Sequence, residues 1–477
     1  MTSTIEIAGL EEGRVRLTPK RLDDLSSRVR SPLLRAGDAG WDDAVLIWNG
    51  MVVKIPALVL QPTSPHEVAA AVGFAREYGL LLSVKGGGHN IAGTSIADGG
   101  LTLDMSRMRD VAVDPAAKLA HVGAGCLLGD VDRATQEHGL ATVLGFVSEV
   151  GVAGLTLGGG LGYLTRRFGW TVDNLEEVEI VTADGQIRTA NRKANADLFW
   201  GIRGAGANLG VVTRFTFRLH EVGPTVYGGL IAWPFERADE VFQTYRQLTT
   251  EAPRELAAWL VLLKAPPAPF VPQEWHGRRV CAMAVCYSGY LDKVGEAVAP
   301  IRALGHPVFD LLREQPYAEV QSYLNATEPK GAHYYWKTEY IAELSHDLLS
   351  TAGEAFAECP IPAGQVGFLH LGGALNADAE DDGAVGNRDA HFAVGVKGHW
   401  EADEPNADMF RQWVRDGWKR IRPFSTGRTY INFQTADEDD QRIRATYGVN
   451  FDRLVQVKKT YDPENVFRSN RNIRPVT

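Results

Sequence analysis

The pattern of apolar and polar positions divides the first part of the chain into short strands and helices. Ser64, Pro65 and Glu67 predict a helix start, because a serine N-cap, a proline in the first turn and a glutamate at the third position suit the free N–H groups there. The helix is expected to end at Gly79, and the apolar run 80–85 predicts a buried strand. Further strands or strand edges are expected at 45–49, 57–60, 101–104, 111–114, 119–122, 177–181 and 186–189.

Two glycine-rich stretches interrupt this pattern. In the first, residues 84–95, three glycines follow Lys85 and precede His89. Consecutive glycines let a backbone approach a ligand closely, and their N–H groups form a nest suited to a phosphate or pyrophosphate. The stretch is neither a Walker A loop nor a G-x-G-x-x-G motif. The second stretch, 145–163, is also flanked by strands, so the two together indicate a ligand larger than one phosphate group.

The character of the sequence changes after residue 221. Glycine clusters become rare over residues 222–430, and tryptophans, alternating strands and helices such as 240–248 appear instead. We expect a second, α+β domain in this region, with a sheet wide enough to line a pocket.

Composition and charge exclude several classes of partner. The chain has 477 residues, of which 45% are hydrophobic and 23% charged, as in ordinary folded proteins. A formal net charge of −10 disfavours nucleic acid and anionic membrane surfaces as partners. The first residues contain no apolar signal segment, and we expect a cytoplasmic protein that is a monomer or a homodimer. The cysteines are spaced too irregularly for a disulfide framework or a zinc site, which predicts buried free thiols and no metal; they are Cys126, Cys281, Cys286 and Cys359.

Four stretches, taken in order, carry a resemblance to a known family. They are KGGGHNIAGTS from Lys85, GVAGLTLGGGLGYL from Gly151, DLFWGIRGAGANLGVVT from Asp197 and a tail that begins YINF at Tyr430. With these motifs the chain resembles the FAD-linked oxidases of the vanillyl-alcohol-oxidase superfamily, in the berberine-bridge-enzyme-like branch.

The resemblance implies an α+β fold of the PCMH type. Its FAD-binding domain is bipartite, formed by residues 1–221 and completed by residues 431–477. A substrate domain, residues 222–430, is inserted between the two parts and is itself α+β, built on an antiparallel sheet.

The resemblance also implies which residues bind FAD. The first glycine loop holds the pyrophosphate, and His89 bonds covalently to the flavin 8α-methyl group. A neutral imidazole is a competent nucleophile, which suits this role; the alternative is that His89 only caps the loop. The other residues expected to bind FAD are Lys85, Gly86, Gly87, Gly88, Asn90, Thr94, Ser95, Val150, Gly151, Gly154, Gly158, Gly159, Gly162, Gly210, Val212, Tyr430 and Asn432.

Three departures from the family pattern stand out. Many relatives tether FAD a second time through a cysteine, and Val147 stands at that position, so one tether is expected. Leu155 stands where relatives often carry histidine, which removes a polar contact near the cofactor. Phe433 stands where plant and carbohydrate-oxidising relatives have the tyrosine that acts as catalytic base.

Oxidation of a substrate by flavin needs a group that accepts a proton from the substrate, and two residues of the inserted domain are candidates. His370 is the more credible base because imidazole titrates near neutral pH; the alternative is a hydrogen-bonded core histidine. Lys397 lies on an expected strand, 393–400. Three roles are open to it: a desolvated base, a group that stabilises reduced anionic flavin, or a solvated lysine at a strand edge. Asn432 is expected to hydrogen-bond near the flavin or the substrate, and Tyr430 to line the same region.

These features favour an FAD-dependent oxidase. The expected reaction takes hydride from a C–OH or C–N centre of a small organic alcohol or amine to flavin N5 and reduces O2 to hydrogen peroxide. Val150 occupies the position at which relatives that react with O2 carry valine, although core packing is an alternative role. The alternatives are a flavin dehydrogenase that uses another acceptor, or a flavin-binding protein with little turnover, which Phe433 suggests.

Overall fold

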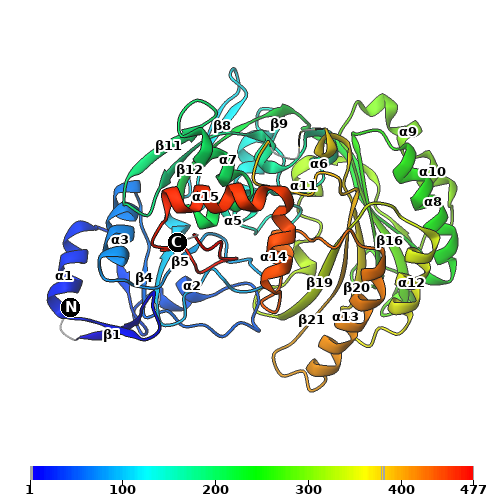
Figure 1. The fold of residues 1–477 in the computed structure, drawn as a ribbon. Helices are drawn as coiled ribbons and strands as arrows, with labels where there is room; N and C mark the ends of the chain where they lie inside the picture. Colours follow the sequence, from blue (N-terminus) through cyan, green and yellow to red (C-terminus); the bar gives the residue numbers. More distant parts are fainter. Residues whose placement is uncertain (1–3, 378, 380–381, 476–477) are drawn as a thin grey trace.

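The structure is a computed structural model that describes residues 4–377, 379 and 382–475. Figure 1 shows two halves side by side, one with small sheets from the blue to green part of the chain and one with a single large sheet. The last helices, drawn in red, return across the first half, so segments far apart in the sequence lie together there. Within the described residues, no helix is long and apolar enough to cross a membrane.

The first sheet has four strands in the order β3-β4-β6-β5, and the last three of these run parallel. Helix α3 connects β4 to β5, and its N-cap Ser64 accepts a hydrogen bond from the N–H of Glu67, as predicted. The first glycine loop therefore begins at the carboxyl end of a parallel strand, where α/β sheets bind ligands. The elements are β1 (Ile5–Ala8), β2 (Arg14–Leu17), α1 (Pro19–Arg28), β3 (Leu33–Leu34), α2 (Trp41–Val45), β4 (Leu58–Leu60), α3 (Pro65–Glu77), β5 (Leu82–Lys85) and β6 (Leu101–Asp104).

The expected strand edge at 45–49 is wrong. The segment Trp41–Val45 instead forms helix α2, since Asp42 and Asp43 in its first turn suit a helix N-terminus, and an irregular loop follows Val45. In that loop Trp48 is buried and packs against Ile91 and Tyr334, so its apolar character serves a contact between distant parts of the chain.

The second sheet is antiparallel and has five strands in the order β11-β10-β12-β8-β7. The strands predicted at 111–114 and 119–122 pair as a hairpin here, and so do those predicted at 177–181 and 186–189. Helices α5 and α7 pack together and carry the second glycine-rich stretch and the third family motif toward the centre of the molecule. The elements are β7 (Val111–Asp114), β8 (Leu119–Gly123), α4 (Leu128–Gln136), β9 (Leu140–Ala141), α5 (Val152–Leu157), α6 (Thr165–Phe168), β10 (Leu175–Val181), β11 (Ile187–Asn191), α7 (Ala196–Ala205), β12 (Val211–Arg218) and β13 (His220–Glu221).

The third sheet is the large one, with the order β17-β14-β16-β15-β20-β21-β19, and β18 pairs with β14. Within the described residues, all strand pairings of this sheet are antiparallel, as expected for the inserted region. Its strands are β14 (Thr225–Pro234), β15 (Leu256–Lys264), β16 (Arg279–Tyr287), β17 (Phe309–Asp310), β18 (Arg313–Pro316), β19 (His333–Ile341), β20 (Gln365–His370) and β21 (Phe392–Trp400).

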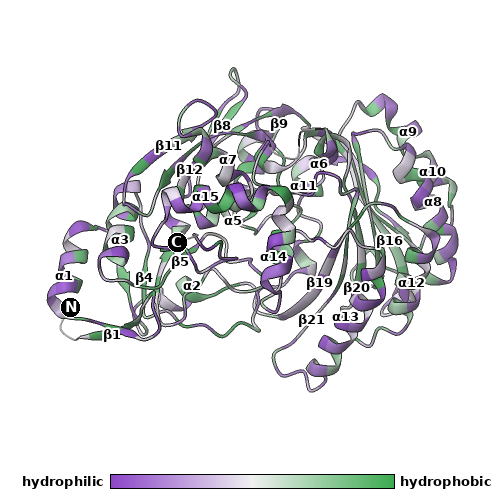
Figure 2. Cartoon of the chain, viewed as in Figure 1, coloured by the Kyte–Doolittle hydropathy of each residue, from purple (hydrophilic) through white to green (hydrophobic). Residues whose placement is uncertain are grey.

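Helices cover one face of the large sheet and leave the other face toward the first half of the molecule. In Figure 1 α8, α12 and α13 lie along the outer side, and Figure 2 shows α13 and α8 largely hydrophilic there. Their apolar sides bury a core against the strands, so only the inner face of the sheet is available to a ligand. The helices are α8 (Ala238–Glu251), α9 (Val294–Ala297), α10 (Ala299–Ala303), α11 (Tyr317–Val320), α12 (His346–Ala357) and α13 (Ala407–Ile421).

The tail packs back onto the first half through α14 (Asp440–Tyr447) and α15 (Phe451–Tyr461). Helix α15 contacts α7, and its Lys458 forms a fully buried ion pair with Asp462 at 2.6 Å. Lys458 Nζ also donates to the carbonyl of Asn208, which ties the tail to the third family motif. The boundaries at 222 and 430 stay predictions, although the strands of the large sheet all fall between them.

Candidate functional site

A cavity of about 580 Å³ lies between the glycine-rich loops, the tail and the inner face of the large sheet. Its walls come from three parts of the chain that are distant in sequence. Of the residues expected to bind FAD, those that line it are Gly86, Gly87, Gly88, His89, Asn90, Thr94, Ser95, Val150, Gly151, Gly154, Gly158, Gly210, Val212, Tyr430 and Asn432.

The two glycine-rich loops touch at Gly87 and Gly151. A Cβ added to Gly87 would lie 2.4 Å from the nitrogen of Gly151, so only glycine permits this contact. Gly88 has a φ of +70°, in the left-handed region that glycine favours. Within the described residues, the N–H groups of 87–90 have no acceptor, so the loop presents free donors of the kind that bind a pyrophosphate.

Lys85, Gly159 and Gly162 do not line the cavity, contrary to expectation. Lys85 is buried; its Nζ donates to the carbonyl of Ala44 at 2.8 Å and lies 3.7 Å from a carboxylate oxygen of Asp104. A Cβ on Gly162 would lie 1.7 Å from a backbone oxygen, so that glycine serves close packing. Gly159 has a φ of +117°, and its place in the turn after α5 requires glycine for conformational reasons.

His89 faces the cavity next to the glycine nest. Its ring stacks on the indole of Trp48, with centroids 5.4 Å apart and planes 17° from parallel. Burial, together with the positive charge of Lys330, lowers the pKa of His89 to about 4. The imidazole is therefore neutral at physiological pH, which is the form that can act as a nucleophile.

The cavity wall has features that fit a large polar cofactor such as FAD. A Cβ on Gly154 would meet nothing within 4 Å, so the missing side chain leaves space beside α5. Among the described residues that line the cavity, Ser95, Ser469 and Asn470 each carry a buried side-chain oxygen without a hydrogen-bond partner. Such atoms are costly unless a ligand or water pairs with them, and their spread along the cavity matches an extended molecule with several polar groups.

The tail motif fastens the cavity wall to α5. The Nδ2 of Asn432 donates to the carbonyl of Leu155 at 3.0 Å and to Tyr430 Oη at 2.8 Å. The N–H of Gly160 also donates to Tyr430 Oη, at 2.8 Å, so this hydroxyl oxygen accepts two hydrogen bonds. Burial raises the pKa of Tyr430 well above its usual range, which keeps the phenol protonated and makes it unsuited to act as a base.

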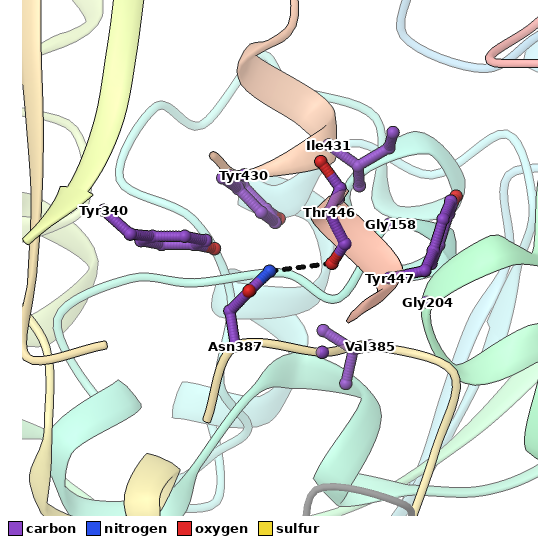
Figure 3. Close-up of a pocket in the computed structure, with 10 residues that line it drawn as sticks. Gly158, Gly204, Tyr340, Val385, Asn387, Tyr430, Ile431, Thr446 and Tyr447 are labelled. Atoms are coloured by element: carbon purple, nitrogen blue, oxygen red, sulfur yellow. Dashed lines mark hydrogen bonds between the residues drawn. The ribbon is translucent and has the colours of Figure 1, made fainter. Parts of the chain in front are cut away.

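Figure 3 shows a second, much smaller pocket, which Tyr430 and Ile431 help to line. It has a volume of about 10 Å³ and shares five lining residues with the large cavity: Gly158, Gly204, Tyr430, Ile431 and Tyr447. Nearby, the Nδ2 of Asn387 donates to the carbonyl of Thr446 at 2.7 Å. This pocket is too small for a cofactor or an organic substrate.

His370 lies on the wrong face of its strand to act on a substrate in the cavity. In β20 Gln365, Gly367 and Leu369 line the cavity, and the alternation of the strand turns His370 to the opposite side. There the Nη1 of Arg166 donates to His370 Nε2 at 2.6 Å. Burial and the guanidinium hold the pKa of His370 well below its usual value, so the ring is the hydrogen-bonded core histidine that the sequence left as an alternative.

Lys397 does line the cavity, and it is paired. Its ammonium forms a short ion pair with Glu328, whose side chain lines the same wall. Sequence reasoning missed Glu328, because it lies in an irregular loop that carries no motif. It also missed Trp48, although the unusual cluster of large apolar residues around it was a usable signal.

The positions that depart from the family pattern lie at the cavity. Val147, Leu155 and Phe433 all contribute to its lining. All four cysteines are free and buried, and within the described residues none lines the cavity. Burial raises the pKa of the Cys126 thiol to about 12, so this sulfur is unreactive at neutral pH.

Comparisons with known proteins agree with this geometry. Residues 56–191 match the family model described as FAD binding domain, and residues 429–474 match the model described as berberine and berberine like. An FAD-linked oxidoreductase of Dictyostelium discoideum is 32% identical over 433 residues, which cover 90% of this chain and 91% of that protein. The (R)-6-hydroxynicotine oxidase of Paenarthrobacter nicotinovorans is 31% identical, with 94% of this chain and 99% of the relative covered.

Two solved structures share the whole architecture. The crystal structure of 6-hydroxy-D-nicotine oxidase from Arthrobacter nicotinovorans superposes with a TM-score of 0.83 at 26% identity, over 94% of this chain and 98% of that one. The berberine-bridge-enzyme-like protein 1 of Physcomitrella patens gives a TM-score of 0.84 at 25% identity, over 96% and 99% of the two chains. The expected α+β fold of the PCMH type is thereby confirmed. This chain belongs to the FAD-linked oxidases of the vanillyl-alcohol-oxidase superfamily, in the berberine-bridge-enzyme-like branch, and is an FAD-dependent oxidoreductase.

Proposed function

We propose that this oxidoreductase carries FAD attached through a single covalent bond to His89 and uses O2 as its electron acceptor. Its substrate is a small organic alcohol or amine, and the reduced product of oxygen is hydrogen peroxide. The observation that carries the proposal is the neutral imidazole of His89 at the cavity wall, directly after a glycine nest with free N–H donors.

The residues of the chain divide the work of binding between the two glycine loops and the tail. The nest at 86–90 holds the pyrophosphate, and His89 contributes the nitrogen of the covalent bond. Asn432 contacts the cofactor or the substrate while its amide keeps Tyr430 and α5 in place. When bound, FAD supplies the hydride acceptor and the electron relay to oxygen.

A single tether follows from the residue types at the wall. Valine cannot form a thioether, and Val147 takes the place of the second tether. Among the described residues that line the cavity no cysteine offers a substitute. A bond through His89 alone is therefore expected to prevent loss of the cofactor.

Use of oxygen is supported by Val150, whose small side chain lies at the cavity wall and leaves room for O2. The same side chain also packs against the core of the first half, so part of its role is structural. Phe433 favours the second candidate function, a flavin-binding protein with little turnover, because a phenyl ring cannot accept a proton.

Two measurements on the purified protein test the proposal. Acid precipitation should give a yellow pellet and a colourless supernatant for the native chain, and the reverse for His89→Ala; free flavin from the native chain contradicts the tether. Photoreduced enzyme mixed with air-saturated buffer should reoxidise within seconds and release peroxide. Reoxidation slower than minutes would rule out the oxidase and favour another acceptor. A cytoplasmic location and a monomeric or dimeric state stay predictions.

A further inference from the structure

The part of the cavity beside the large sheet has an apolar, nearly flat floor. Gly367 of β20 pairs directly with Gly395 of β21, and both line the cavity. A Cβ on Gly367 would touch only a methyl of Val261, at 3.9 Å, so a side chain there would extend into the open space. The floor therefore suits a flat, largely apolar molecule, such as a fused aromatic ring system.

One end of this floor carries polar side chains. Lys397 stands opposite Gln365 on one side and Trp336 on the other, in register across three antiparallel strands. Residues directly opposite in antiparallel strands point to the same face, and all three line the cavity. The two positions nearer the other end of the same strands, Leu369 and Ala393, are apolar.

Most polar side chains of this wall already have partners. The indole N–H of Trp336 donates to the carbonyl of Phe433 at 2.6 Å, and the hydroxyl of Thr338 is hydrogen-bonded to Thr429 Oγ1 at 2.6 Å. Within the described residues, the amide of Gln365 has no partner, and the ammonium of Lys397 has Glu328 alone.

The charge at this end favours a negative ligand. The side chain of Lys397 is 30% exposed, whereas that of Glu328 is 11% exposed, so the ammonium faces the cavity more openly than the carboxylate. An ammonium has three donors, and Glu328 accounts for one of them. Lys330 adds positive charge close enough to lower the pKa of His89 at the same end of the cavity.

We propose that Lys397, oriented by Glu328 and assisted by Gln365, binds an anionic oxygen of a flat, largely apolar substrate. The oxygen is a carboxylate or a phenolate, since either presents the same acceptor to the ammonium. This inference rests on the proposed function, because it names the substrate class of the same cavity. A substrate that arrives as a phenolate needs no base to ionise it, which agrees with Phe433 in place of the usual tyrosine.

Calorimetric titration of the flavin-loaded enzyme with four naphthalene probes tests the proposal. The probes are 2-naphthoate, 4-nitro-1-naphtholate, the neutral 2-naphthamide and the cationic 2-naphthylmethylammonium. The carboxylate, the phenolate or both should bind about tenfold more tightly than the amide, as expected for a charge-assisted hydrogen bond. Which anion prevails identifies the oxygen. Equal affinity of both anions and the amide, or tighter binding of the ammonium, overturns the proposal.

Variants separate recognition from folding. Lys397→Met should abolish the preference for anions without changing the affinity for 2-naphthamide, and Lys397→Arg should retain the preference. Glu328→Gln should tighten anion binding, because it removes the negative charge from the pair. Lys419→Met, an exposed lysine on α13 paired with Asp416, is the control and should change nothing. Equal weakening of anion and amide by Lys397→Met, with Lys397→Arg behaving alike, would indicate a structural role and contradict the proposal.

The same preparation distinguishes this proposal from the proposed function. Flavin attachment and reoxidation by O2 are measured without any probe. If attachment and reoxidation fail but binding is selective for anions, the proposed oxidase function is contradicted and the anion site is supported. If attachment and reoxidation are intact but binding is not selective, only the anion site is contradicted.

Discussion

The indole of Trp48 stacks on the imidazole of His89, with ring centroids 5.4 Å apart. The indole also stacks on Tyr334 of β19, with ring centroids 3.7 Å apart, and the indole N–H of Trp48 donates to the carbonyl of Glu328 at 3.2 Å. Trp48 thus joins the residue expected to hold the flavin to the loop and strand of the large sheet.

Loss of this stacking should impair flavin attachment. Trp48→Leu removes the aromatic surface that orients His89, and we expect the covalently bound flavin fraction to fall by about tenfold, since small misplacement of a reacting group is costly. Trp48→Phe retains a ring and should keep most of the attachment. The measurement is in-gel flavin fluorescence after denaturation.

Trp413→Leu is the matched control, because its indole N–H also donates to a backbone carbonyl, that of Ala355, on the outer helices. Attachment that survives Trp48→Leu as well as it survives Trp413→Leu would show that stacking on His89 does not matter.

The rate of flavin attachment should be insensitive to mild acid. An ordinary histidine, with a pKa near 6.5, is about three-quarters protonated at pH 6 and loses its nucleophilic form. Burial and Lys330 lower the pKa of His89 to about 4, so its neutral form persists down to about pH 5. Apoprotein mixed with FAD should become labelled at equal rates from pH 5.5 to 8. A decline of several-fold between pH 7.5 and 6 would contradict the lowered pKa.

The carboxyl of Asp132 should make stability depend on pH. It is buried in α4 with the amide of Gln321 as its hydrogen-bond donor at 3.3 Å, and burial raises the pKa of Asp132 to about 7. The pKa is higher in the folded state than in the unfolded chain, where it is about 3.9. The stability from this proton is therefore full below about pH 4 and is lost as the pH rises through 7.

Asp132→Asn should remove that loss. We expect it to stabilise the protein at pH 8 by on the order of 3 kcal/mol and to have little effect at pH 4.5. Thermal melting across this pH range checks the result. Asp130→Asn, two residues away, is the control of opposite sign: burial raises the pKa of Asp130, but hydrogen bonds from Arg109 and Leu127 outweigh it and hold this pKa low. Asp130→Asn should therefore lower the melting temperature at pH 8. If Asp132→Asn also lowers the melting temperature at pH 8, the destabilising role assigned to the buried Asp132 carboxylate is refuted.

Contact between the two glycine loops should be required for FAD binding. In Gly87→Ala the new methyl would lie 2.4 Å from the nitrogen of Gly151, so the loops must separate. We expect the flavin content of the purified protein to fall at least about tenfold, since displaced N–H donors no longer converge on the pyrophosphate. The absorbance ratio of flavin to protein measures this.

Gly73→Ala is the matched control, because a Cβ there meets nothing within 4 Å and the residue lies in the interior of α3. It should retain the flavin and raise stability by about 0.5–1 kcal/mol. Full flavin content in Gly87→Ala would show that the loops tolerate separation.

Local chemistry made much of the first half predictable. The start of α3 at Ser64 and the hairpin turns depend on residues within a few positions of each other, so the sequence alone identifies them. Consecutive glycines before His89 likewise indicate a ligand loop, because no other residue gives the backbone the same freedom. Tertiary packing overrode the pattern at Trp48. The apolar residues around it in the sequence suggested a strand edge, but the Trp48 side chain packs in a contact between the two halves.

The sequence by itself determined that the chain has a glycine nest followed by a histidine, no cysteine at the expected second tether and no tyrosine at position 433. Only the tertiary structure decided which side chains meet in the cavity. A strand turns alternate residues to opposite faces, so Leu369 lines the cavity and His370 packs behind it, and a sequence does not state which face is inward. Trp48 and Glu328 are 280 positions apart and share a hydrogen bond, because the folded chain brings both loops to the same end of the large sheet.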